Sequence, residues 1–178
     1  LPHRGERPLL PAALKAIIPP AQAAGPRPVT RHARRMLLLA GCVQDALAPR
    51  INAAAQRVLD RLGITLETAP AAGCCGAISH HLTATDEARD FMRRNIDAWW
   101  PHIKAGAEAI VVTASGCAVQ VKDYGRLLAD DPVYAGRAAR VSELARDLSQ
   151  VIAAEDVSTL APAAGAPRRI AFQSPCTL

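Results

Sequence analysis

The chain has 178 residues, enough for one α/β domain with extensions and for a substantial buried core. Half of the residues are apolar but only 3% are aromatic, so small and aliphatic side chains must build that core. The formal net charge of +5 comes from scattered arginines without interleaved aromatic residues, which argues against nucleic-acid binding. No apolar run approaches the roughly 20 residues that a membrane-spanning helix requires.

The chain carries five cysteines, an odd number that argues against a closed set of disulfides. Proline and charged residues interrupt the first positions, which therefore do not form a signal peptide, and we expect a cytoplasmic protein. In that reducing compartment cysteines more often bind metal or carry out redox chemistry. The mildly basic surface also suits a peripheral position on an anionic membrane face.

Taken in chain order, the sequence alternates between strand-like and helix-like segments. Residues 1–33, rich in Pro and Ala, are expected to be a connector from an upstream module, with one short helix over 9–18. Continuous apolar runs predict three strands, over 36–40, 64–68 and 109–113. Helical spacing of apolar residues predicts helices over 51–62, 88–103, 117–129 and, from an N-cap at Ser142, to residue 152. This alternation predicts an α/β fold, a Rossmann-like parallel sheet with flanking helices.

The end of the chain repeats the plan of the first strand. A linker over 161–167 precedes a fourth predicted strand over 169–173, which Cys176 follows. Two arginines, an apolar run and a cysteine come in the same order in both places. We therefore expect one complete domain over 34–160, and in 161–178 the linker and first strand of a truncated second copy. Since the chain also lacks an initiator methionine, we expect it to be a piece of a longer protein.

Four cysteines follow the three predicted strands: Cys42, Cys74, Cys75 and Cys117. The loops after parallel strands gather at one edge of a sheet, where ligands bind, so we expect these thiols to converge there. Glycines beside them would let the backbone approach a bulky ligand closely. Cys117 also lies near the start of a predicted helix, where the helix dipole stabilises the thiolate that binds metal.

Other interpretations of these cysteines stay open. Zinc sites normally show paired C-x-x-C spacing, which is absent, whereas adjacent cysteines can hold different irons of a larger cluster. Cys74 and Cys75 could also form a strained vicinal disulfide, and any single cysteine could simply be a small buried apolar side chain. His80 and His81 could be ligands, acid–base groups or a polar helix entry, and the last interpretation is favoured. No G-x-G-x-x-G follows the first strand, so dinucleotide binding has no support.

The sequences Gly41-Cys42, Gly73-Cys74-Cys75-Gly76 and Ser115-Gly116-Cys117 resemble those of the cysteine-rich CCG domain family. Within it the chain is most similar to the iron–sulfur subunits of glycolate oxidase, through the CCG and SGC segments, Val121 to Gly125 and Arg169 to Cys176. The resemblance implies an upstream ferredoxin-like module followed by two CCG domains.

The same resemblance implies a cofactor and partners. Cys42, Cys74, Cys75 and Cys117 would hold an iron–sulfur cluster, either 4Fe-4S or the non-cubane cluster of the heterodisulfide reductase branch. That branch closes a C-x-x-C where this chain has Gln120, which leaves four thiolates, enough for one ordinary cluster. Cys176 would belong to the second site.

The function that this resemblance implies is electron transfer. The chain would take electrons from FAD on a partner subunit that oxidises glycolate or another 2-hydroxy acid, and pass them toward quinone at a membrane surface. Two alternatives are a metal-free thiol/disulfide switch at Cys74–Cys75 and a docking module for the flavin and membrane subunits whose cysteines are buried.

Overall fold

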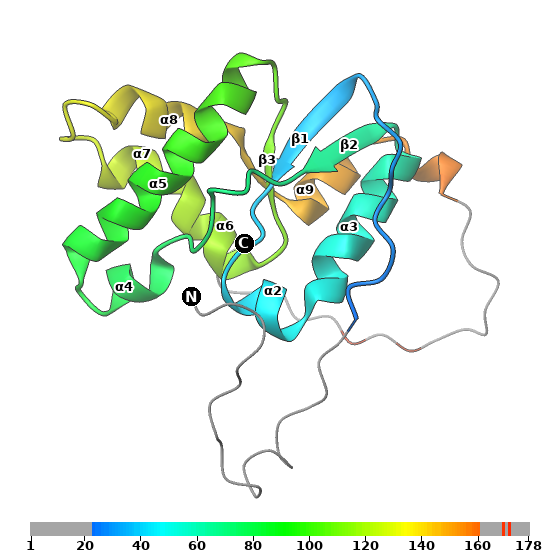
Figure 1. The fold of residues 1–178 in the computed structure, drawn as a ribbon, viewed down its shortest axis with the longest axis horizontal. Helices are drawn as coiled ribbons and strands as arrows, with labels where there is room; N and C mark the ends of the chain where they lie inside the picture. The colour runs from blue at the N-terminus through cyan, green and yellow to red at the C-terminus, as the bar shows by residue number, and fades with distance from the viewer. Residues whose placement is uncertain (1–22, 161–168, 170, 172–178) are drawn as a thin grey trace, which may run out of the picture.

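The computed structural model describes residues 23–160, 169 and 171 (Figure 1). One sheet has the strand order β2-β1-β3-β4, with β1 (Arg34–Leu38), β2 (Ile64–Glu67), β3 (Ile110–Val112) and β4 (Ala145–Asp147). Every pairing is parallel, which confirms the predicted fold class. The helix predicted over 9–18, Cys176 and most of the strand predicted over 169–173 lie outside the described residues.

Helices connect each strand to the next. Between β1 and β2 lie α2 (Val43–Leu47) and α3 (Pro49–Arg61), and between β2 and β3 lie α4 (Ala77–His81) and α5 (Thr85–Lys104). Between β3 and β4 lie α6 (Ser115–Lys122), α7 (Tyr124–Leu127) and α8 (Ala135–Leu144). After β4 come α9 (Leu148–Ala153) and the short 3-10 helix η1 (Val157–Thr159). The single helix predicted over 117–129 is thus two helices that meet at Asp123.

The prediction of a helix N-cap at Ser142 is wrong. Ser142 lies inside α8, where its hydroxyl accepts a hydrogen bond from the Gly125 amide and donates one to the Val121 carbonyl. The strand β4 follows, and α9 begins after Asp147, whose carboxylate accepts a hydrogen bond from the Ser149 amide. The sequence gives no sign of β4, because exposed Arg146 separates its two buried residues.

The two faces of the sheet are covered by different helices (Figure 1). One face packs against α5, α6, α7 and α8, and its core includes Leu37, Leu39, Met92, Ile96, Trp99, Ile110, Val112, Tyr124 and Val141. The other face packs against α3 and α9, and its core includes Met36, Leu38, Leu59, Ile64, Leu66, Val111 and Val151. Because the sheet is buried on both sides, its inner strands are continuous apolar runs, as predicted.

The order of the strands determines where a crevice can form. From β1 the chain passes outward to β2 through α3 on one face, and then returns to β3 through α5 on the opposite face. Strands β1 and β3 are therefore neighbours whose following helices diverge to opposite faces. In open parallel sheets this switch point, at the carboxyl ends of the strands, is where ligands bind.

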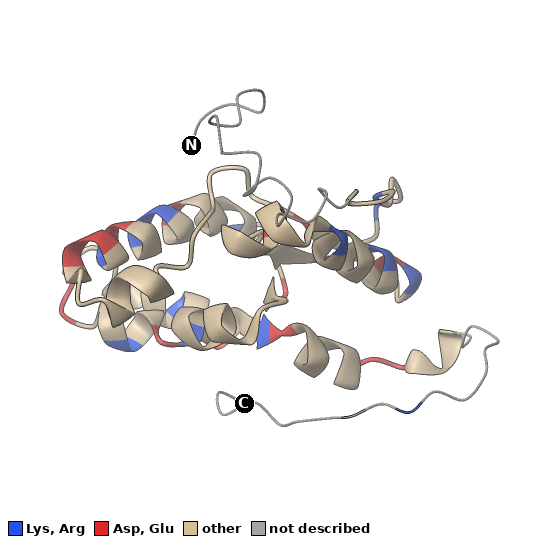
Figure 2. Cartoon of the chain, turned by 90° about the horizontal axis from the view of Figure 1, so that it is seen from below, with Lys and Arg blue, Asp and Glu red and all other residues tan. Residues whose placement is uncertain are grey.

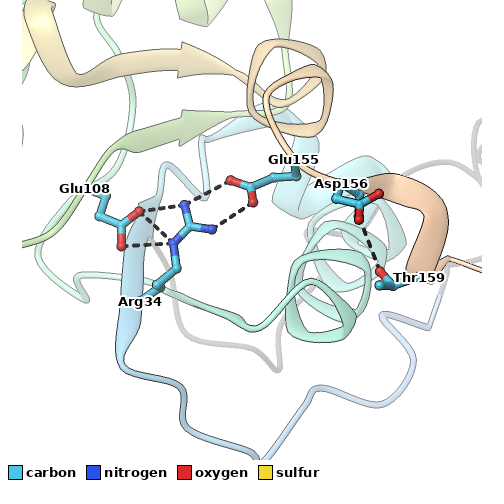
Figure 3. A network of polar contacts seen from close by, with 5 residues as sticks. All are labelled: Arg34, Glu108, Glu155, Asp156 and Thr159. Carbon is cyan, nitrogen blue, oxygen red and sulfur yellow. Dashed lines mark hydrogen bonds and ion pairs between the residues drawn. The ribbon is translucent and has the colours of Figure 1, made fainter.

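At the amino ends of the strands, opposite the switch point, an arginine joins three segments. The Arg34 guanidinium, at the start of β1, donates to Glu108 before β3 at 2.8 Å and to Glu155 after α9 at 2.7 Å (Figure 3). Elsewhere Lys and Arg are interspersed with Asp and Glu along the helices (Figure 2). Among the described residues, no helix has both the length and the apolar character needed to cross a bilayer.

Candidate iron–sulfur site

The loops after β1, β2 and β3 bring four cysteines to one cavity. Cys42 lies between β1 and α2, Cys74 and Cys75 between β2 and α4, and Cys117 in the first turn of α6 after β3. All four line a cavity of about 510 Å³ at the switch point between β1 and β3. The convergence expected from the sequence is therefore what the structure shows.

The four thiols differ in exposure. Cys42 is exposed, Cys74 and Cys117 are half-buried, and Cys75 is buried. The sulfur atoms of Cys42 and Cys74 lie 3.5 Å apart. Within residues 23–160, no three His, Cys, Asp or Glu side chains are grouped closely enough to hold a single metal ion.

Contacts among the thiols shift their acidity in opposite directions. A hydrogen bond between the Cys75 and Cys117 side chains lowers the pKa of Cys117 and raises that of Cys75. Burial raises the pKa of Cys42. The pKa of Cys117 is thus lowered, as expected, with the neighbouring Cys75 thiol as the main cause.

The donor set and the space around it fit an iron–sulfur cluster. Four cysteine thiolates are the usual ligand set of such clusters. Two of the flanking glycines face open space, since a Cβ atom built at Gly41 or Gly116 would meet no atom within 4 Å. Both glycines line the cavity, so they leave room for a bulky group beside the thiols.

The other two glycines of the site have a different role from the one predicted. A Cβ at Gly73 would lie 2.9 Å from the guanidinium of Arg94, and one at Gly76 would lie 3.0 Å from the carbonyl oxygen of Ala88. Gly76 also has a φ of +85°, which glycine adopts readily and other residues rarely do. These two glycines therefore allow the segment Gly73–Gly76, here called the CCG loop, to pack closely against α5.

Two buried polar residues that sequence reasoning missed hold this loop. Asn95 of α5 accepts a hydrogen bond from the Gly73 amide and donates one to the Cys74 carbonyl. The Tyr124 hydroxyl donates to the Cys75 carbonyl. Burial raises the pKa of Tyr124 well above its ordinary value, so this hydroxyl stays protonated. The available signal was Asn95 itself, an amide on the otherwise apolar face of α5.

A second polar cluster holds the loops after β1 and β3. The buried Asn52 of α3 donates to the Ala40 carbonyl and accepts a hydrogen bond from the Thr113 hydroxyl. Gln44 of α2 donates to Asn52 and also contacts Thr113. These contacts tie the loop that carries Cys42 to the end of β3.

The histidines and Gln120 lie beside the cavity in different ways. His80 and His81 form the last turn of α4, not a helix entry, and only His81 lines the cavity. Nδ1 of His80 lies 3.2 Å from the Oε1 atom of the buried Gln120. Gln120 thus faces α4 and is not among the residues that line the cavity.

Large aliphatic side chains surround the thiols. Val43, Leu47, Ile51 and Ile78 line the cavity and are 41–70% exposed. No Arg or Lys is among the described residues that line the cavity. A thiol-rich, largely apolar cavity of this kind suits a metal–sulfur group.

Comparisons with known proteins give a matching family and several similar proteins. Residues 36–122 match the cysteine-rich domain family CCG. The chain is 50% identical over 173 residues to the glycolate oxidase iron-sulfur subunit of Escherichia coli K12, covering 97% of this chain and 42% of that protein. It is 27% identical over 145 residues to the probable glycolate oxidase iron-sulfur subunit of Bacillus subtilis, covering 82% of this chain and 32% of that protein.

A third relative carries a different name. Lactate utilization protein A of Bacillus cytotoxicus is 29% identical over 118 residues, covering 66% of this chain and 47% of that protein. The chain therefore spans less than half the length of each of these relatives. No solved structure matches the chain.

Proposed function

We infer, because residues 36–122 belong to the cysteine-rich CCG domain family, that this domain binds an iron–sulfur cluster and carries electrons. Cys42, Cys74, Cys75 and Cys117 would be its ligands. The observation that carries the proposal is that these four thiols, from three separate loops, line one cavity. When bound, the cluster would supply reversible one-electron transfer.

The chain's own residues hold and shape the site. The Asn95–Tyr124 pair fixes the CCG loop, and the cluster of Asn52, Gln44 and Thr113 fixes the loop of Cys42. Aliphatic side chains line the cavity around the thiols. A site with rigid ligands suits electron transfer, because little has to rearrange when the charge of a bound cluster changes.

The similarity to glycolate oxidase iron–sulfur subunits supports a place in an enzyme that oxidises glycolate. The oxidation of the hydroxy acid would take place at FAD on a partner subunit, since hydride chemistry belongs to that cofactor. A cluster held by the four cysteines of this cavity would receive the electrons and pass them toward quinone at a membrane surface.

Iron content and cysteine variants test this proposal in the full-length protein together with its flavin partner, purified without oxygen. We expect Cys74→Ser and Cys75→Ser each to lose iron and acid-labile sulfide and to stop electron transfer to a quinone analogue, while glycolate still reduces the flavin. Cys176→Ser is the matched control, because Cys176 is predicted to belong to a different site and should leave this cluster unchanged.

Wild-type levels of iron and of quinone reduction in both variants would overturn the proposal. Protein without iron whose Cys74 and Cys75 interconvert between dithiol and disulfide would instead establish the metal-free switch. The docking alternative assumed buried cysteines, but of these four only Cys75 is buried.

A further inference from the structure

A buried amide of α5 makes two hydrogen bonds to the backbone of the CCG loop. Asn95 lies on the inner face of α5 and is completely buried. Its Oδ1 atom accepts from the Gly73 amide at 2.9 Å, and its Nδ2 atom donates to the Cys74 carbonyl at 2.8 Å and to the Tyr124 hydroxyl at 3.0 Å. A side-chain amide has two N–H donors, so both donors of Asn95 are used.

Tyr124 extends this chain of hydrogen bonds to the next residue of the loop. Its hydroxyl accepts from Asn95 and donates to the Cys75 carbonyl at 2.8 Å. The ring is also completely buried and stacks on Trp99, with ring centroids 6.4 Å apart. Two consecutive carbonyl groups of the loop, those of Cys74 and Cys75, are therefore directed inward, away from the cavity.

Because the peptide bond is planar, the direction of the Cys74 carbonyl also determines the direction of the Cys75 N–H beside the thiols. In a trans peptide the carbonyl and the following N–H point in opposite directions. When Asn95 holds the Cys74 carbonyl inward, the Cys75 N–H must point the other way. The backbone N–H groups of Cys75 and Ala77 act to lower the pKa of the Cys75 thiol, although the Cys117 side chain and burial raise it overall. Such N–H groups stabilise negative charge on sulfur.

We propose that Asn95 and Tyr124 are positioning residues that fix the two adjacent thiols of the CCG loop and turn the Cys75 N–H toward the cavity. The part of this inference that concerns the cluster rests on the proposed function. Hydrogen bonds to cluster sulfur are among the factors that set reduction potential. Loss of the pair should therefore make the potential of the bound cluster more negative and expose Cys75 more often.

The two tyrosines in the described part of the chain provide a matched pair of variants. Tyr124→Phe removes only the hydroxyl and keeps the stacked ring, so the inward hydrogen bond to Cys75 is lost. Tyr134→Phe is the control, because the Tyr134 hydroxyl donates to Asp97 at the surface, at 2.6 Å. Both variants are made in the full-length protein, and each is studied with and without iron.

The first measurement is alkylation by iodoacetamide in the iron-free protein, followed by mass spectrometry with exposed Cys42 as internal reference. We expect Tyr124→Phe to speed alkylation of Cys75 about tenfold, as loss of one buried hydrogen bond predicts, and Tyr134→Phe to leave it unchanged. The second measurement is a redox titration of the iron-loaded protein, in which Tyr124→Phe should shift the cluster potential downward and Tyr134→Phe should not.

If Tyr124→Phe does not fold, Asn95→Asp serves the same purpose, because aspartate still accepts from Gly73 but cannot donate to Cys74. An unchanged alkylation rate of Cys75 in the variant that folds would overturn the inference. The two proposals can fail separately. Protein that binds no iron would contradict the proposed function, whereas the alkylation rate of Cys75, which is measured without metal, would still test the positioning role.

Discussion

Differences in surroundings give the four thiols of the cavity different chemistry. Cys42 and Cys74 come from loops 32 residues apart, yet their sulfur atoms are separated by only 3.5 Å. A disulfide bond is about 2.05 Å long, so a small movement would join them. Cys75 instead forms its hydrogen bond with Cys117, inside the domain.

This geometry predicts which disulfide forms when no iron is bound. We expect mild oxidation of the iron-free protein with diamide to join Cys42 to Cys74, and not Cys74 to Cys75 as a vicinal switch would require. Peptide mapping under non-reducing conditions measures the product. The Cys75→Ser variant should form the same bond and Cys74→Ser should not, so a predominant Cys74–Cys75 product would contradict the prediction.

Gly76 affects the stability of the site through its backbone. Its positive φ and the Ala88 carbonyl beside it leave no space for a side chain, so Gly76→Ala should destabilise the domain by about 1–3 kcal/mol. Gly136, in α8, has no atom near its Cβ position, and Gly136→Ala should stabilise by up to about 1 kcal/mol. Urea denaturation of both variants checks the contrast, and equal effects would argue against it.

Among the elements, α9 depends on the residue that caps its N-terminus, Asp147. The Asp147 carboxylate accepts from the Ser149 amide at 2.9 Å, and the Gln150 side chain accepts from the Asp147 amide at 3.0 Å, which together form a capping box. Asp147→Ala should cost about 1 kcal/mol of stability, the usual effect of removing a cap. Asp147→Asn keeps the acceptor and should be nearly neutral in thermal unfolding. A large loss in both variants would show that the charge matters, and not the cap.

This capping region also shows where prediction from sequence ends. Strands β1 and β3 could be predicted from their apolar runs, and helices α3 and α5 from the spacing of their apolar residues, because these local patterns reflect which side chains are buried. Strand β4 could not, because its three residues become a strand only by pairing with β3. The same holds at the site. The strand ends placed the four cysteines, whereas Asn95 and Tyr124 acquire their roles from contacts between distant helices.

The ion pairs of Arg34 connect three segments at the amino ends of the strands, on the side of the sheet away from the cysteines. Arg34 pairs with Glu108 and Glu155 and so joins β1, the start of β3 and the end of α9 (Figure 3). Because Arg34 is 43% exposed, we expect Arg34→Met to cost only about 1 kcal/mol at neutral pH, and less at high salt. Arg140→Met, which breaks only a surface pair with Glu143, is the control and should cost less than about 0.5 kcal/mol.

The cost of removing Arg34 should also depend on pH. The hydrogen bond from Arg34 holds the pKa of Glu155 below its ordinary value of 4.5. A carboxylate with a lowered pKa in the folded state stabilises the fold fully above its unfolded pKa, and loses that effect as pH falls through the folded value. The difference in stability between wild type and Arg34→Met should therefore be constant near neutrality and shrink below about pH 4.5. A difference that grows on acidification would contradict this account.

Across the whole domain, the three cysteine loops are parts of one fold but are fixed by separate polar groups. Asn95 and Tyr124 hold the CCG loop from one face of the sheet, and Asn52 holds the loop of Cys42 from the other. A group that binds all four thiols would join these regions across the switch point. Because it would bind only the folded arrangement, it would stabilise the domain through linkage.

Hydrogen exchange of the full-length protein, with and without iron, would test whether one bound group links the three cysteine loops. We expect bound iron to slow exchange at residues 41–44, 73–77 and 114–118 together, since each loop supplies at least one thiol to the cavity. Helix α8, none of whose residues line the cavity, should change little and serves as the internal control. Slower exchange in one loop alone would mean that the thiols do not share a ligand. The opposite result is slower exchange in all three loops that disappears in the Cys75→Ser variant. It would mean that the loops share one cluster, since no single loop carries four cysteines.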